Sequence, residues 1–235
     1  MGSSKMAKKH RQLYKEKSSK FSLLPIAFTI FVIPLLVYMK VVELTDIEIE
    51  NWLGGEVHPD FFNAIKVQWL MIGTILAIVF FLVYFIIKRF EFKKSFAYIP
   101  IVTYAILIVL STITSDYPEV ALNGFVGRYE GMWVLLSYLA LFVITFNLVK
   151  DESQIKFLLG ALLISATIVA LIGTFQFFNM DIFRTDFGKK LILPEAYHEY
   201  REGLEFVFED SNVYATLSNP NYVGSYVALL LPIAF

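Results

Sequence analysis

The segment 127–131, with the sequence Gly-Arg-Tyr-Glu-Gly, carries a residue type suited to binding phosphate. Arg128 is the only basic residue between positions 115 and 130, and the flanking glycines allow a close approach of the backbone. The planar guanidinium of arginine can donate two parallel hydrogen bonds to phosphate oxygens. We therefore expect Arg128 to hold a phosphate group. The alternative is that it pairs with Glu130 or with lipid head groups at a membrane surface.

A second segment, 216–226, has the sequence Thr-Leu-Ser-Asn-Pro-Asn-Tyr-Val-Gly-Ser-Tyr and predicts the start of a helix. Asn219 and Asn221 are of a type favoured at helix N-termini, and Pro220 suits the first turn. The free N–H groups and the positive dipole end of such a helix favour a bound anion, above all phosphate. The alternative is that these residues only cap the helix and turn the chain.

A third, weaker candidate is Arg201, which follows Tyr-His-Glu-Tyr at 197–200. His198 has the chemistry of a general base because the pKa of histidine lies near neutrality. A single loop histidine beside acidic residues is more often a solvated side chain. The chain has no cysteine and only three scattered histidines, so it predicts no metal site and no cofactor.

The elements that must position these residues are membrane helices. Of the 235 residues, 57% are hydrophobic and only 17% are charged, whereas a soluble domain has roughly 45–50% apolar and about 25% charged residues. The sequence predicts an all-α, polytopic transmembrane helix bundle with five complete spans and the start of a sixth. The expected spans are about 21–42, 67–87, 96–114, 131–149 and 157–178, followed by the incomplete run 221–235. Because that last run is short, we expect the chain to be part of a longer protein.

Charge segregation predicts the orientation of the bundle in the cytoplasmic membrane. The basic tail 1–20 and the segments 88–95 and 150–156 together hold 13 basic and 4 acidic residues, and the rest of the chain holds 7 and 17. Because basic residues favour the cytoplasmic side, these three segments are expected inside, with the N-terminus. The domain 21–235 then exposes three outer loops, 43–66, 115–130 and 179–220. The first reads as a simple exposed loop, and a small β-hairpin is possible in the third. Nucleic acid is not an expected partner.

From about residue 95 onward, the chain resembles the O-antigen ligase/polymerase-like superfamily of bacterial polytopic membrane proteins. The resemblance is carried by Ser115-Asp116, by Gly-Arg-Tyr-Glu-Gly at 127–131 before a span, and by Ser-Asn-Pro-Asn-Tyr-Val-Gly-Ser-Tyr at 218–226. It implies a metal-independent glycan ligase or polymerase that takes its glycan from an undecaprenyl-diphosphate donor. It also implies transfer to a glycan, lipid or protein acceptor on the outer side of the cytoplasmic membrane, in polysaccharide biosynthesis for the cell envelope.

On this resemblance, one set of residues is expected to bind the diphosphate or the glycan: Arg128, Tyr129, Glu130, Asn219, Asn221, Tyr222 and, more loosely, Arg201. Members of the superfamily usually take a catalytic histidine from a later outer loop, so no catalytic residue is predicted here. Two other functions stay open, a membrane permease or flippase and a non-catalytic membrane subunit. The expected spans lack charged residues at mid-depth, which weakens the transporter hypothesis.

Overall fold

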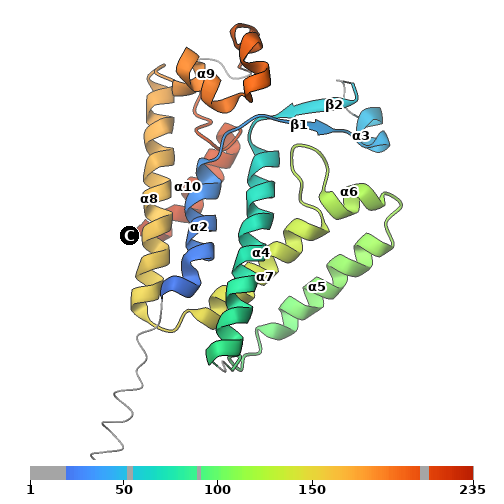
Figure 1. Ribbon diagram of the computed structural model, residues 1–235, viewed down its shortest axis with the longest axis vertical. Coiled ribbons are helices and arrows are strands. Elements are labelled where there is room, and N and C mark those ends of the chain that lie inside the picture. Colours follow the sequence, from blue (N-terminus) through green and yellow to red (C-terminus); the bar gives the residue numbers. More distant parts are fainter. Residues whose placement is uncertain (1–19, 52–54, 89–90, 207–211, 235) are drawn as a thin grey trace, which may run out of the picture.

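The computed structural model describes residues 20–51, 55–88, 91–206 and 212–234, and it is mostly helical with one two-stranded sheet (Figure 1). The two longest helices are α4 (Asn63–Lys88) and α8 (Glu152–Phe177). The basic tail lies, up to residue 19, outside the described residues. The other apolar helical segments are η1 (Lys20–Leu23), α2 (Leu24–Val32), η2 (Ile33–Leu35), α5 (Tyr98–Ile113), α7 (Met132–Leu148) and α10 (Pro220–Ala234). Short helices are α3 (Asp46–Asn51), α6 (Pro118–Asn123), η3 (Ile182–Arg184), α9 (Asp186–Ile192) and η4 (Glu195–Gly203).

Among the described residues, two helices, α4 and α8, are long and apolar enough to cross a membrane. Helices α5 and α7 have 16 and 17 residues, which at a rise of 1.5 Å per residue gives about 24–26 Å, short of the ~30 Å hydrocarbon core. The first apolar run, 21–42, is helical only as far as Leu35. Beyond it the chain becomes extended and enters strand β1 (Lys40–Glu43). The predicted helical class is therefore confirmed, whereas the bundle of five complete spans is not confirmed.

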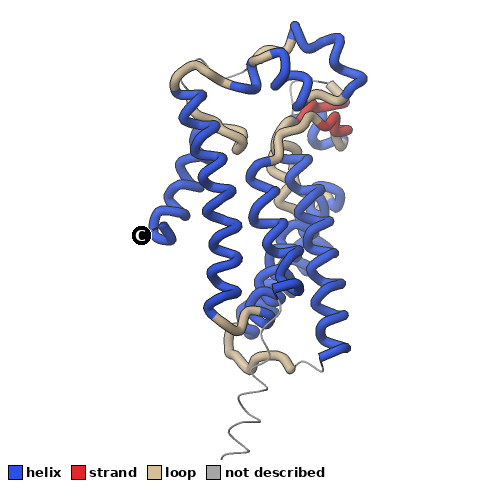
Figure 2. The backbone as a smooth tube through the Cα atoms, turned by 60° about the vertical axis from the view of Figure 1, so that its left-hand side comes forward, coloured by secondary structure: helices blue, strands red, loops and turns tan. Residues whose placement is uncertain are grey.

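The long helices run alternately between two ends of the molecule (Figures 1 and 2). One end holds the sheet, α3, α6 and α9, and the other holds the turns 91–97 and 149–151. Helix α2 packs between α8 and α4, α4 packs against α7, and α7 packs against α5. The three segments expected on the outer side therefore share one end, which we call the loop end. The opposite end is called the basic end.

Each end has its own apolar cluster. At the basic end, buried side chains of η1, α2, α4, α7 and α8 pack together, among them Leu23, Phe81, Ile144 and Leu148. At the loop end, a second cluster joins segments that are distant in sequence: Met39, Phe183, Ile192, Leu193 and Tyr214. Burial of these side chains fixes the segment 182–193 over the top of the bundle.

The two-stranded sheet lies at the first expected outer loop and not in the third. Strand β1 pairs antiparallel with β2 (Val57–Asp60), with Lys40 opposite Asp60. The expectation that 43–66 is a simple exposed loop is therefore wrong. The described residues of the two expected strands, 204–206 and 213–217, contain no strand, and the expected turn 210–212 lies, except for Asn212, outside the described residues. Residues 214 and 215 are instead held by Gln176 of α8, and Ala215 has a positive φ of 47°, which interrupts an extended chain.

Candidate functional site

The segment that carries Arg128 forms a loop closed by two glycines, residues 124–131, which we call the Arg128 loop. Gly124 has a φ of +83°, and a Cβ atom on Gly131 would lie 2.3 Å from the Gly124 nitrogen. The two backbones therefore cross in direct contact, which only glycine permits at this distance. The sequence suggested that Gly127 and Gly131 allow a ligand to approach the backbone. The structure shows that Gly131 serves the closure of the loop itself.

The interior of the Arg128 loop is anchored by two side chains from the first outer segment. The backbone N–H of the buried Val126 donates to Glu48 Oε1 at 2.6 Å. The side-chain amide of Asn63 donates to the carbonyl of Gly127. Glu48 is itself buried and also accepts hydrogen bonds from the backbone and hydroxyl of Thr45. The backbone that immediately precedes Arg128 is thus fixed by residues of the first outer segment.

Arg128 itself is exposed at the tip of this anchored loop. Glu130 is also exposed, and no residue in the described part of the chain forms an ion pair or hydrogen bond with the Arg128 guanidinium. The predicted alternative, pairing of Arg128 with Glu130, is therefore not seen in the structure. An unpaired guanidinium on a fixed backbone can donate to an incoming anion without first breaking an internal ion pair.

Tyr129 differs from its two neighbours because its side chain turns into the protein. Its φ is +55°, and its hydroxyl is buried. Burial and the nearby carboxylate of Asp60 raise the pKa of Tyr129 far above its ordinary value, so the phenol stays neutral. Tyr129 is therefore positioned to hold the loop, whereas Arg128 and Glu130 face outward.

The first turn of α4 joins the two segments that the sequence singled out. Asp60 caps this turn, because its Oδ1 accepts the N–H groups of residues 62–64 at 2.6–3.1 Å. Asn63 then contacts Gly127 of the Arg128 loop, and the ammonium group of Lys66 donates to the carbonyl of Thr216. One helical turn therefore contacts both the Arg128 loop and the chain that leads into α10.

Helix α10 begins at Pro220, as the sequence predicts. The side chain of Asn219 accepts the N–H of Tyr222 at 3.0 Å, so Asn219 acts as the helix cap. Asn221 and Tyr222 are exposed on the first turn. The capping interpretation thus holds for Asn219, and Asn221 and Tyr222 remain accessible to a ligand.

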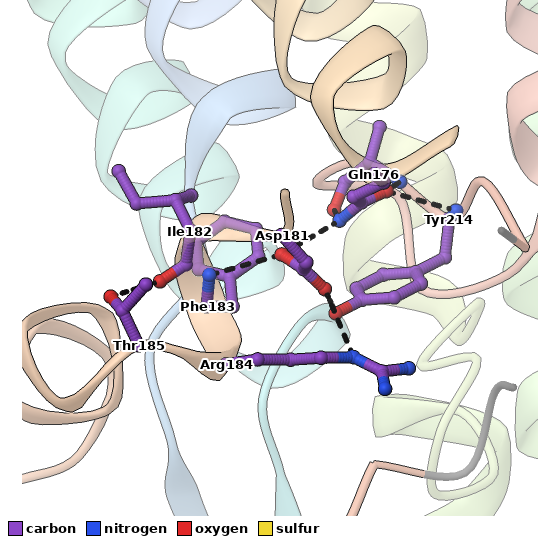
Figure 3. A network of polar contacts seen from close by, with 8 residues as sticks. Gln176, Asp181, Ile182, Phe183, Arg184, Thr185 and Tyr214 are labelled. Carbon is purple, nitrogen blue, oxygen red and sulfur yellow. Dashed lines mark hydrogen bonds and ion pairs between the residues drawn. The ribbon is translucent and has the colours of Figure 1, made fainter. Parts of the chain in front are cut away.

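A buried polar network that sequence reasoning missed holds the chain just before α10 (Figure 3). We call it the Asp181 clasp, and it consists of Gln176, Asp181, Arg184 and Tyr214. Asp181 accepts hydrogen bonds from the Tyr214 hydroxyl and from the backbone N–H of Phe183, and its Oδ2 lies 3.6 Å from Arg184 Nε.

Gln176 completes the clasp at the C-terminal end of α8. Its Oε1 accepts the N–H groups of Tyr214 and Ala215 at 3.2 and 2.6 Å, and its Nε2 donates to the carbonyl of Ala215. Because these groups are buried and bonded to one another, the clasp fixes the start of the 214–219 segment.

Arg201 is engaged elsewhere at the loop end. Its Nε donates to Asp186 Oδ1 at 2.6 Å, and its Nη1 donates to the carbonyl of His198 at 2.8 Å. His198 Nε2 lies 3.0–3.1 Å from the carbonyl oxygens of Lys190 and Leu193. Arg201 and His198 therefore serve to pack η4 on α9, which weakens the assignment of either to a ligand.

Two of the residues missed at this site carried a signal in the sequence. Lys66 is the only lysine or arginine in 43–66, as Arg128 is in its own segment, and Asp60 stands at a position typical of a helix cap. The partners of Gln176 lie 38 and 39 residues away, so no local pattern indicates them. Within the described ranges, no group of three histidine, aspartate or glutamate side chains is placed to hold a metal ion. Comparison of the chain with protein-family models, with curated proteins and with solved structures gives no match.

Proposed function

We propose that the chain is a multi-pass protein of the cytoplasmic membrane, with its N-terminus inside and its loop end outside. Helices α4 and α8 are long enough to span, and α2, α5, α7 and α10 accompany them as shorter membrane segments. Helix α5 supports this placement, because large apolar side chains along it are exposed, with Ile99 at 63% and Ile113 at 74%. A surface of this kind is stable against lipid and unfavourable against water.

We further propose that the loop end binds the diphosphate of a polyprenyl-linked glycan donor, as the resemblance to O-antigen ligases implies. The observation that carries the proposal is the exposed guanidinium of Arg128. The loop that holds it and the chain that leads into α10 both contact the first turn of α4. Asn221 and Tyr222, on the first turn of α10, are the second set of groups open to the donor.

In the proposed reaction, a hydroxyl of the acceptor attacks the anomeric carbon of the donor glycan. A new glycosidic C–O bond forms while the bond between that carbon and the diphosphate oxygen breaks, and the hydroxyl proton passes to a general base. The diphosphate leaves with additional negative charge, which Arg128 stabilises. The proposal assigns no base among the residues of this chain.

A binding measurement tests this proposal. The purified chain in detergent micelles is titrated with undecaprenyl diphosphate, and affinity is measured by microscale thermophoresis. Arg128→Ala should weaken binding about 10- to 100-fold, because a charge-assisted hydrogen bond contributes about 1.5–3 kcal/mol. Arg201→Ala is the matched control and should bind like the wild type, because that guanidinium is already paired with Asp186. Equal affinity of wild type and Arg128→Ala would overturn the proposal.

A further inference from the structure

A pocket lies at the basic end, far from the Arg128 loop along the helices. It has a volume of about 610 Å³ and is formed by the last turns of α7 and the first turns of α8. Its walls include Phe142 and Ile155, which are 52% and 47% exposed. Lys93 and Lys150 line the same pocket. Apolar walls and two ammonium groups therefore meet in one open site.

The ammonium group of Lys93 is held at the pocket by neutral partners. Its Nζ donates to the carbonyl oxygens of Phe146 and Val149, each at 2.6 Å, and lies 5.1 Å from the centre of the Phe146 ring. These contacts fix the position of the charge without neutralising it. An ammonium group has three N–H donors, so one further acceptor can bind.

Lys150 brings a second positive charge close to the first. Its Nζ lies 3.3 Å from the Tyr84 hydroxyl and 5.5 Å from the centre of that ring. Burial, and then the charge of Lys150, lower the pKa of Lys93 from its ordinary value. A bound anion between the two ammonium groups would relieve this repulsion.

Two acidic residues also line the pocket, and both have partners of their own. Asp151 Oδ1 accepts the N–H of Gln154 at 3.0 Å and so caps α8. Glu152 pairs with Lys156 at 2.8 Å. Glu152 is therefore neutralised by Lys156, whereas Asp151 keeps its charge at the N-terminus of α8, where the helix dipole stabilises it.

We propose that this pocket binds the phosphate group of an anionic phospholipid, with its acyl chains against Phe142 and Ile155. The two lysines complement the phosphate, and the exposed apolar walls complement the chains. The inference rests on the proposed placement of the chain in a membrane, and it is independent of the proposed glycan donor.

Native mass spectrometry of the full chain in detergent, with phosphatidylglycerol or phosphatidylcholine added, tests the inference. We expect phosphatidylglycerol to bind the wild type at least about fivefold better than phosphatidylcholine, and Lys150→Gln to lose most of this preference. Lys93→Arg keeps the charge and should keep the preference. Lys94→Gln removes an exposed charge at the same end of the molecule, from a residue that does not line the pocket, and should also keep it.

Three results would overturn the inference: equal binding of the two lipids, an unchanged preference in Lys150→Gln, or an equal loss in Lys94→Gln. Arg128→Ala should leave lipid binding unchanged. Failure of donor binding and failure of this lipid site are therefore distinguishable.

Discussion

The Asp181 clasp and the Arg128 loop lie at the same end of the molecule and use similar residues in opposite ways. Each places a tyrosine near an aspartate, with an arginine in the same segment. In the clasp the charge of Asp181 is buried and met by Tyr214, Gln176 and Arg184. In the loop the backbone is fixed while the arginine points outward without a described partner. The difference separates charges that hold the fold from a charge that is presented to a ligand.

The largest loss of stability is expected in the Asp181 clasp, to which the comparison assigns a structural role. Asp181→Ala should lower the free energy of unfolding by about 3–5 kcal/mol, because it leaves buried donors and the Arg184 charge without their partner. Thermal unfolding in detergent measures this change. Asp186→Ala removes an exposed acid from the same region and should shift the melting temperature much less. Equal shifts for the two variants would mean that the clasp does not hold this end of the molecule.

A smaller effect is expected at the neck of the Arg128 loop. Gly131→Ala should cost about 2–3 kcal/mol, because its methyl group meets the Gly124 backbone. Gly127→Ala is the matched control, since its Cβ meets nothing within 4 Å and only its φ of +82° is unfavourable. That substitution should cost about 1 kcal/mol. If the melting temperatures of the two variants fall in the reverse order, the crossing of the two backbones does not close the loop.

Arg128→Ala tests whether this arginine binds a ligand rather than stabilising the fold. Because no described residue pairs with the guanidinium, the free energy of unfolding should change by less than about 0.5 kcal/mol. The same preparation should show the 10- to 100-fold loss of donor affinity expected above. Thermal unfolding and binding are measured together on this variant. A large loss of stability would show that Arg128 holds the fold, as Asp181 does.

The smallest effect concerns Arg201 and its exposed partner. The hydrogen bond from Arg201, followed by that from Lys190, lowers the pKa of Asp186 below its ordinary value of 3.8. Because the pKa of Asp186 is lowered on folding, the contact stabilises the fold at pH values above its ordinary pKa of 3.8. This stabilisation is lost as the pH falls through the lower folded-state pKa. Arg201→Ala should move the Asp186 titration back toward 3.8, as measured by carbon NMR of labelled aspartate. An unchanged titration would show that Arg201 does not contact Asp186 in solution.

Local patterns in the sequence predicted the helices well. The run 131–149 corresponds to α7, and the Asn-Pro pair at 219–220 begins α10, because hydrophobic length and capping chemistry are local properties. The first apolar run, 21–42, was predicted as one helix, but its last residues belong to β1 and pair with β2. The two strands are separated along the chain, so the local pattern of the run does not indicate their pairing.

The parts of the site that were not predicted depend on contacts between distant residues. Arg201 resembled a free cation in the sequence, and its engagement with Asp186 across 15 residues was not visible. The Gln176 contacts to 214–215 and the Lys66 contact to Thr216 span still longer separations. Such pairings follow from the packing of the helices rather than from any single segment.

Photo-crosslinking tests the central claim, that the Arg128 loop and the start of α10 hold the donor diphosphate, most directly. The full chain in lipid nanodiscs is irradiated with a polyprenyl diphosphate that carries a photoreactive group next to the diphosphate, and the labelled peptides are identified by mass spectrometry. Labelling within 124–131 and 216–223, reduced in Arg128→Ala and retained in Arg201→Ala, is the predicted result. Labelling confined to the basic end, around 91–97 and 149–156, would contradict the claim.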